Sequence, residues 1–229
     1  MAATQDKTDE VKFSHQVADF IQKYRKGIFI SFAAIILLLA GSIITITVRD
    51  RIQARALREL DALSSRYGEL RFFIGSEEDD LHQGDIALLL EDLGAFQNRN
   101  SGFPAALAYN ISAHIHWEQE NWAEAELAWT RAAASSGRTY LAPISLFNAA
   151  AAAEEQGNID TAIDLYRQAV AQGTAFPAAP RAQFSIARLE EYRNNREAAL
   201  QAYRTLVNQW PNDPLWTNLA QSRILLLDN

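Results

Sequence analysis

The sequence predicts an all-α protein in which one transmembrane helix is followed by an α-solenoid, a stack of helical hairpins. Three observations predict this fold. Residues 27–48 form a run of 22 residues without a charge. Three related segments begin at Asn121, Asn158 and Asn195, so one pattern recurs with a period of 37 residues. Elsewhere, apolar residues recur every three or four positions, which is the spacing of one helix face.

Composition and charge exclude several classes of protein. The chain has 229 residues, of which 48% are hydrophobic, and this is enough to form a core. Residues 75–229 contain 10 arginines, 20 acidic residues and no lysine. Such a surface repels a phosphate backbone, so we expect no nucleic acid partner. The absence of cysteine excludes disulfides, zinc fingers and iron–sulfur sites.

The uncharged run at residues 27–48 is expected to be a transmembrane helix. As a helix it would be about 33 Å long, which is enough to cross the hydrocarbon core of a bilayer. A buried helix is disfavoured because the run is apolar all round. A cleavable signal peptide is disfavoured by the length of the run and by the charged residues 49–51 that follow it.

The N-terminal tail, residues 1–26, contains a second short pattern. Val17, Phe20, Ile21 and Tyr24 have the spacing of an amphipathic helix. This helix either lies on the membrane surface or extends the transmembrane helix into water.

The basic residues that flank the span bear on its orientation. These are Lys23, Arg25 and Lys26 before the span, and Arg49, Arg51, Arg55 and Arg58 after it. The positive-inside comparison is close to a tie. The compact cluster before the span and the acidic domain after it favour a cytoplasmic N-terminus and a periplasmic repeat domain. The expected location is therefore the inner (cytoplasmic) membrane, with a single span.

Residues 49–102 are expected to form a helical stalk and a degenerate first hairpin. Its first helix carries Ile52, Ala56, Leu60, Leu63, Tyr67, Leu70 and Ile74 at helical spacing, and its second carries Ile86, Leu89, Leu90, Leu93 and Phe96. Residues 103–211 then contain three hairpins. The polar or glycine pairs that begin at Glu120, Gly157 and Asn194 are expected to form the turns within them. Residues 212–229 are expected to form a capping helix, in which Trp216, Leu219, Ala220 and Ile224 cover the last hairpin.

The three hairpins share a set of small and aromatic positions. These are Ala113, Ala125, Trp129 and Ala132; Ala150, Ala162, Tyr166 and Ala169; and Ala187, Ala199, Tyr203 and Leu206. A small residue lets two helices cross closely, and a ring fills the space beside the crossing. This pattern resembles the tetratricopeptide repeat (TPR) family. It differs from that family in its period of 37 rather than 34 residues and in its lack of a closing proline except at Pro211.

The resemblance implies a curved ribbon whose inner face, lined by the first helix of each hairpin, binds a protein partner. Carried over to this sequence, that partner-binding groove contains Asn110, His114, Trp117, Phe147, Ala151, Glu154, Phe184, Arg188 and Glu191. Aromatic rings mixed with charges are typical of recognition surfaces. The alternative is that Trp117, Phe147 and Phe184 are ordinary core residues.

The sequence shows no signal for catalysis, a metal or a cofactor, and we predict none of them. His114 and His116 lie two residues apart on a helix, so they point in different directions and are expected to line the core or the groove. The acidic loop with Glu77, Glu78, Asp79, Asp80 and His82 lacks the ligand spacing of a calcium loop. No glycine-rich phosphate loop or nucleophile elbow is present.

The expected function is that of a membrane-anchored scaffold or adaptor for protein–protein interactions in the bacterial cell envelope. The order of its parts resembles the bacterial ancillary subunit of the Sec translocon, and this resemblance implies translocon or periplasmic chaperone subunits as partners. One alternative is a structural component of an envelope machine, such as a secretion system or the periplasmic collar of a spirochaete flagellar motor. Another is a non-catalytic regulatory subunit of a membrane enzyme.

Overall fold

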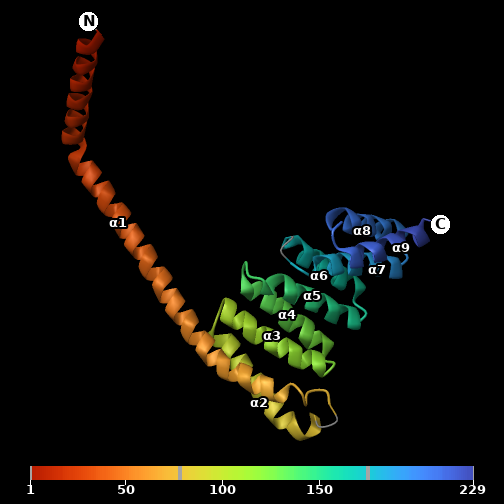
Figure 1. Cartoon of the computed structure of the whole chain (residues 1–229). Coiled ribbons are helices and arrows are strands. Elements are labelled where there is room, and N and C mark those ends of the chain that lie inside the picture. Colours follow the sequence, from red (N-terminus) through yellow and green to blue (C-terminus); the bar gives the residue numbers. More distant parts are fainter. Residues whose placement is uncertain (1, 77–78, 174–175, 229) are drawn as a thin grey trace. The chain divides into compact units, whose positions relative to one another are not determined.

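The computed structural model describes residues 2–76, 79–173 and 176–228, with side chains from residue 22 onward except at 28, 33, 79 and 80. Within these residues it contains helices and no strand (Figure 1), so the all-α prediction is confirmed. The helices are α1 (Ala2–Leu70), α2 (Asp79–Arg99), α3 (Phe103–Glu118), α4 (Trp122–Ser136), α5 (Leu141–Glu155), α6 (Ile159–Ala171), α7 (Ala179–Tyr192), α8 (Arg196–Gln209) and α9 (Pro214–Leu227). The chain divides into two compact units, Met1–Ala54 and Arg55–Asn229.

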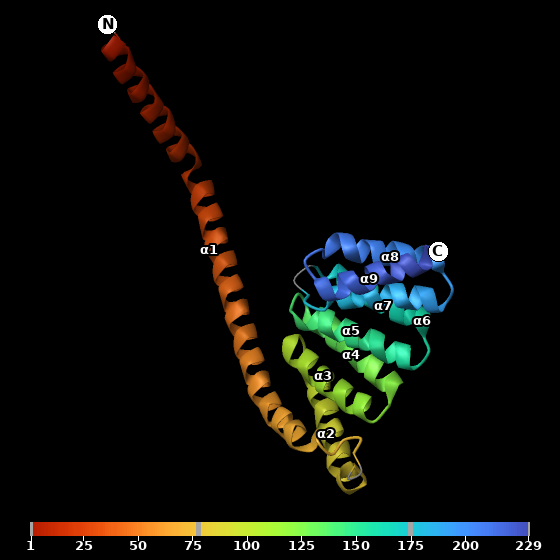
Figure 2. The same ribbon diagram turned by 45° about the vertical axis from the view of Figure 1, so that its right-hand side comes forward.

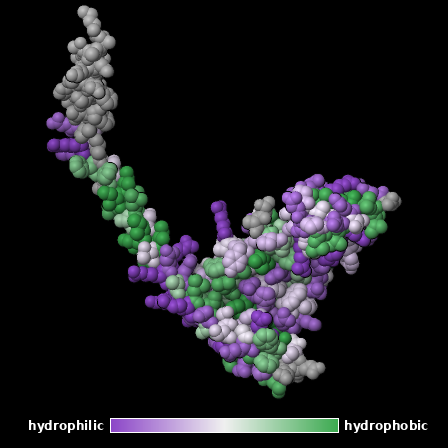
Figure 3. All heavy atoms as spheres, in the orientation of Figure 1, coloured by the Kyte–Doolittle hydropathy of each residue, from purple (hydrophilic) through white to green (hydrophobic). Residues whose placement is uncertain are grey.

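The first unit consists of the N-terminal part of α1. It is the one helix, among the described residues, that is long and apolar enough to cross a membrane by length and composition. Figure 3 shows a hydrophobic stretch of this helix with hydrophilic residues on either side. The described side chains of this stretch are exposed all round. The predicted amphipathic pattern at Val17, Phe20 and Ile21 lies outside the described side chains.

The second unit begins with the C-terminal part of α1, which packs against α2 and α3. Ala56 and Leu60 of α1 lie in one buried cluster with Leu89 and Phe96 of α2 and with Ile115 of α3. Ion pairs support the same contact, from Arg66 to Asp92 at 2.5 Å and from Arg99 to Glu59 at 2.8 Å. Two expectations for α1 were wrong. Ile52 is exposed, and α1 ends at Leu70, so Ile74 lies in the turn that follows and is nevertheless buried.

Three hairpins follow, formed by α3 with α4, α5 with α6, and α7 with α8 (Figures 1 and 2). The repeated alanines lie where the two helices of a hairpin pack together, and each is fully buried. They are Ala113, Ala125, Ala150, Ala162, Ala187 and Ala199. The rings of Trp129, Tyr166 and Tyr203 are also buried. The hairpin repeat is therefore confirmed, with a small side chain at each helix crossing, as close packing requires.

The turns within the hairpins repeat the same backbone geometry. Glu120, Gly157 and Asn194 have positive φ values of 58°, 74° and 62°. In each turn the amide of the next residue donates to a carbonyl five residues earlier. The pairs are Asn121 to His116 at 2.8 Å, Asn158 to Ala153 at 2.9 Å and Asn195 to Glu190 at 2.8 Å. This is the Schellman arrangement, which satisfies the last carbonyls of a helix.

The last helix, α9, packs against α7 and α8. Asp213 caps it, since its carboxylate accepts a hydrogen bond from the Trp216 amide at 3.3 Å. Ala220 is buried, and Trp216 and Ile224 pack against the repeat core as predicted. Leu219 was expected to join them, but it lies on the outer side of the helix and is 42% exposed.

Candidate protein-binding face

The nine predicted groove residues lie on α3, α5 and α7, three on each helix. We call the side of these helices that carries them the A-helix face. None of the nine is fully buried, and Arg188 is exposed. Trp117, Phe147 and Phe184 also pack against the repeat core. Each of these rings therefore contributes to the core and to the surface.

The α3 end of the A-helix face is an aromatic cluster. The ring of Trp117 lies 4.7 Å from that of Trp122 and 5.6 Å from that of Trp129, measured between centroids. His114 meets Trp129 edge to face at 5.3 Å. The indole nitrogen of Trp129 donates to Asn110 at 3.2 Å. Two of the predicted residues, His114 and Asn110, are thus partly occupied in holding Trp129.

The middle of the A-helix face combines a ring with an ion pair. Phe147 packs against Tyr166 at 5.2 Å and carries the guanidinium of Arg181 over its ring at 5.1 Å. Glu154 accepts a hydrogen bond from the Tyr166 hydroxyl at 3.4 Å and forms an ion pair with Arg188 at 2.5 Å. This ion pair links α5 to α7. Ala151 lies between Phe147 and Glu154 on α5 and is partly buried.

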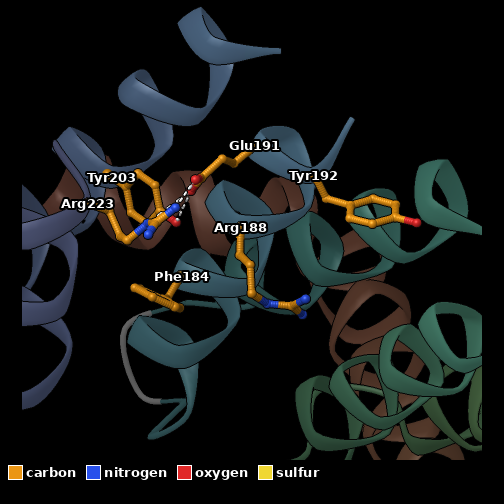
Figure 4. A pocket seen from close by; sticks show the side chains of 6 residues that line it. All are labelled: Phe184, Arg188, Glu191, Tyr192, Tyr203 and Arg223. Carbon is orange, nitrogen blue, oxygen red and sulfur yellow. Dashed lines mark hydrogen bonds and ion pairs between the residues drawn. The ribbon is translucent and has the colours of Figure 1, made fainter. Parts of the chain in front are cut away.

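The α7 end of the A-helix face contains a pocket of about 440 Å³. Its lining comprises three predicted residues, Phe184, Arg188 and Glu191, and three that the sequence did not indicate, Tyr192, Tyr203 and Arg223 (Figure 4). No tyrosine occupies the position of Tyr192 in the other repeats. Tyr203 was assigned to the core, and Arg223 belongs to the capping helix. The period of 37 could have identified none of them as surface residues.

Glu191 organises this pocket. It accepts a hydrogen bond from the Tyr203 hydroxyl at 3.1 Å and from the Arg223 Nε at 3.2 Å, and a second Arg223 nitrogen binds its other oxygen. Phe184 packs between Tyr203 and Trp216, with 5.4 Å between centroids in both cases. Both arginines of the pocket are therefore held by carboxylates, Arg223 by Glu191 and Arg188 by Glu154. The pocket is an aromatic-walled recess whose charges are already balanced.

Burial changes the titration of several groups on this side of the solenoid. It raises the pKa of Tyr166 to about 12, with Glu154 as a second cause, and it raises the pKa of Tyr203 to about 12. Both hydroxyls therefore keep their protons at physiological pH and can donate to the glutamates. Burial lowers the pKa of His114, against an opposing effect of Glu118. The lowered pKa favours the neutral form of His114 beside Trp129.

The two histidines of α3 have different surroundings, as expected. His114 packs on Trp129, whereas the buried Nδ1 of His116 has no hydrogen-bond partner among the described residues. No group of three His, Asp or Glu side chains able to hold a metal ion occurs in the part of the chain that the structure describes. Of the acidic loop, His82 stacks on Phe73 with 4.0 Å between ring centroids. Glu77 and Glu78, and the side chains of Asp79 and Asp80, lie outside the described residues.

Comparisons with known proteins agree with this architecture. The family model described as "Tetratricopeptide repeat" matches residues 112–180 and 147–214. A protein of Treponema pallidum (strain Nichols), described as "TPR repeat-containing protein", is 29% identical over 181 residues. The similarity covers 72% of this chain and 74% of that relative. Residues 112–214, from within α3 to the start of α9, therefore contain tetratricopeptide repeats.

Proposed function

We propose that this chain is a membrane-anchored scaffold whose A-helix face binds a protein partner. The pocket lined by Phe184, Tyr203 and Arg223 carries this proposal, because it is a preformed recess on the side where the repeats present rings and charges. Tetratricopeptide repeats serve as protein-interaction domains, and the match to this family supports the general role. We propose no catalytic activity and no cofactor.

The membrane anchor is supported by the chemistry of the first unit. Its apolar side chains, such as Phe29 and Leu37, are exposed, and lipid would cover them at no cost. Three hydroxyls within the span are satisfied inside the helix. Ser42, Thr45 and Thr47 each donate to the carbonyl four residues earlier at 2.8 Å. Such back-bonding lets a polar side chain lie in hydrocarbon.

The pocket suits a large apolar side chain of the partner. Its walls include the rings of Phe184 and Tyr203, which offer area at little cost in conformational entropy. The paired arginines leave no strong unbalanced charge to attract a lone ion. The ion pairs also fix the positions of Arg188 and Glu191, so little ordering is required on binding.

The test is site-specific photo-crosslinking in cells that produce the full-length protein. A photoreactive amino acid is introduced at Tyr192, which lines the pocket and is 73% exposed. The control is the same change at Tyr140, which is 67% exposed and does not line the pocket. We expect a discrete crosslinked protein at Tyr192 only. Equal crosslinking at both sites, with capture of partners unchanged in Tyr192→Ala, would show that the A-helix face is not the binding surface.

For the partner we propose subunits of the Sec translocon or a periplasmic chaperone, with the protein in the inner membrane and its repeats in the periplasm. This rests on the order of tail, span and repeat domain. The second candidate is a structural role in an envelope machine, including a spirochaete flagellar motor collar. One observation favours it, namely that a relative occurs in the spirochaete Treponema pallidum. A regulatory subunit of a membrane enzyme is the third.

Crosslinked material from Tyr192 distinguishes these candidates. Translocon or chaperone subunits would support the first, motor or secretion components the second, and a single enzyme the third. Protease treatment of spheroplasts tests the orientation independently. Digestion of the repeat domain in spheroplasts, but not in intact cells, is the result expected for a periplasmic location.

A further inference from the structure

The outer side of α9 carries a stripe that is left exposed by the described residues of the second unit. It consists of Leu215, Leu219, Ser222 and Leu226, and we call it the α9 seam. The three leucines are 62%, 42% and 66% exposed, and Ser222 is exposed as well. A terminal helix of a solenoid normally presents a polar outer face. The exposed leucines of the α9 seam depart from that rule, so a capping role alone does not explain them.

The spacing of the α9 seam is that of a helix–helix contact. Successive members are four, three and four residues apart, which is the alternation of a and d positions in a coiled coil. At 100° per residue the four side chains fall within about 60° of one another around the helix. The opposite side of α9, with Thr217 and Ala220, is the side buried against the repeats. The seam therefore suits a second helix packed along α9 from outside.

The seam is also symmetric about its own midpoint, between Ala220 and Gln221. Turned end for end, it places Leu215 against Leu226 and Leu219 against Ser222 of an identical helix. A two-fold contact requires this kind of self-complementary surface. We propose that α9 pairs antiparallel with α9 of a second copy of this chain, so that the protein is a homodimer.

Charge favours a second copy at this place rather than elsewhere. The chain has a net charge of −7, so most of its surfaces repel an identical molecule. Within α9 the only charged residue is Arg223, and it turns inward to Glu191. The Ser222 hydroxyl donates to the Asn218 carbonyl at 2.9 Å. It can therefore face a leucine without losing a hydrogen bond.

The contact is modest in size. It joins two helices of 14 residues each, which is less than a standard stable interface, so we expect a dissociation constant on the order of micromolar. Anchoring both copies in one membrane would raise their effective concentration.

Disulfide trapping tests the pairing and its direction, because the chain has no cysteine of its own. Leu215→Cys and Leu226→Cys are produced together in one membrane as full-length proteins with tags of different size. An antiparallel pair gives a disulfide between the two variants, and little when either is produced alone. The control is Leu127→Cys on α4, a leucine outside the seam that is 50% exposed. Self-linked Leu215→Cys as the main product would overturn the antiparallel pairing.

Sedimentation of the purified full-length protein in detergent provides the second measurement. Ser222→Glu places a charge in the seam and should raise the dissociation constant at least about tenfold. Gln221→Glu adds the same charge to the same helix outside the seam and should leave it unchanged. Circular dichroism verifies that both variants remain folded. A monomeric wild type, with no disulfide above the Leu127→Cys level, would overturn the proposal and leave the seam to a different protein.

Discussion

The hydroxyl of Tyr203 donates to the carboxylate of Glu191 at 3.1 Å, and 37 residues earlier the hydroxyl of Tyr166 donates to Glu154 at 3.4 Å. Each hydrogen bond joins the two helices of one hairpin on the A-helix face. Each glutamate then binds an arginine of a later helix, Arg188 of α7 for Glu154 and Arg223 of α9 for Glu191. One glutamate per repeat thus connects a hairpin to itself and to its neighbour. In the first repeat Trp117 takes the place of the glutamate.

These tyrosines should make the repeat domain sensitive to alkaline pH. Their pKa is about 12 in the folded state and about 10 in the unfolded state. Between these values the folded state binds more protons than the unfolded state, so the free energy of unfolding falls as pH rises. We expect a loss of about 1–2 kcal/mol per tyrosine between pH 10 and 12. Urea titrations followed by tryptophan fluorescence measure it.

The positions of the lysines and tryptophans simplify the interpretation of this titration. All four lysines lie in residues 1–26, and all five tryptophans lie between residues 117 and 216. Tyr166→Phe and Tyr203→Phe should each reduce the slope of stability against pH above pH 10. Tyr140→Phe, which removes an exposed hydroxyl, should not. Parallel profiles for wild type and the double Phe variant would contradict the assignment.

Substitutions at the three hairpin turns should change the stability of the domain in opposite directions. Replacing the turn glycine by alanine should lower it, and replacing Glu120 or Asn194 by glycine should raise it. Gly157 has a φ of 74° and open space around its α-carbon. Gly157→Ala should therefore destabilise the domain by about 1 kcal/mol through backbone conformation alone. Glu120→Gly should stabilise it by about 0.5 kcal/mol, and Asn194→Gly by less, because asparagine tolerates a positive φ better than glutamate does.

A helical glycine provides the control for the turns. Gly84 lies inside α2 and also has open space around it. There the exchange to alanine should raise stability by about 1 kcal/mol, because alanine favours helices. A loss at Gly84 similar to that at Gly157 would mean that φ does not govern these effects. Thermal unfolding by circular dichroism compares all four variants.

The period and the alternation of small and aromatic residues were sufficient to predict the hairpins, their turns and the buried alanines. Those features depend on contacts that recur in every repeat, so the same residue pattern occurs three times in the sequence. The pocket residues Tyr192 and Arg223 were not predictable. Tyr192 has no equivalent in the period, and Arg223 depends on the angle at which α9 docks. Leu219 was misassigned for the same reason, since helical spacing alone does not say which side of a last helix faces inward.

Gly75 should control the attachment of the first hairpin to the repeats. It has a φ of 70°, and a β-carbon added there would overlap the carbonyl oxygen of Glu118 at the end of α3. Gly75→Ala should cost about 2–3 kcal/mol, from backbone strain and from displacement of the turn. Hydrogen exchange should therefore increase in α2 and remain unchanged in α7 and α8. If Gly75→Ala increased hydrogen exchange equally along the whole domain, this local role would be contradicted.

Gly137 is the matched control for Gly75. Its φ is 63°, but no atom of the described residues lies within 4 Å of an added β-carbon. Gly137→Ala should carry only the conformational cost of about 1 kcal/mol. The difference between the two variants measures the contact with Glu118.

Glu190 should hold the second and third repeats together. Its carboxylate is buried and binds Arg167 of α6 at 3.0 Å, Arg193 at 2.6 Å and the side-chain amide of Asn195 at 3.1 Å. Removing the charge with Glu190→Gln leaves two arginines without their main partner. We expect a loss of about 2 kcal/mol, less than for a fully buried pair because both arginines reach solvent. Asp164→Asn removes an exposed partner of the same Arg167 and should cost under 0.5 kcal/mol. Equal effects of the two variants in urea titration would show that burial of Glu190 adds nothing to the junction between these repeats.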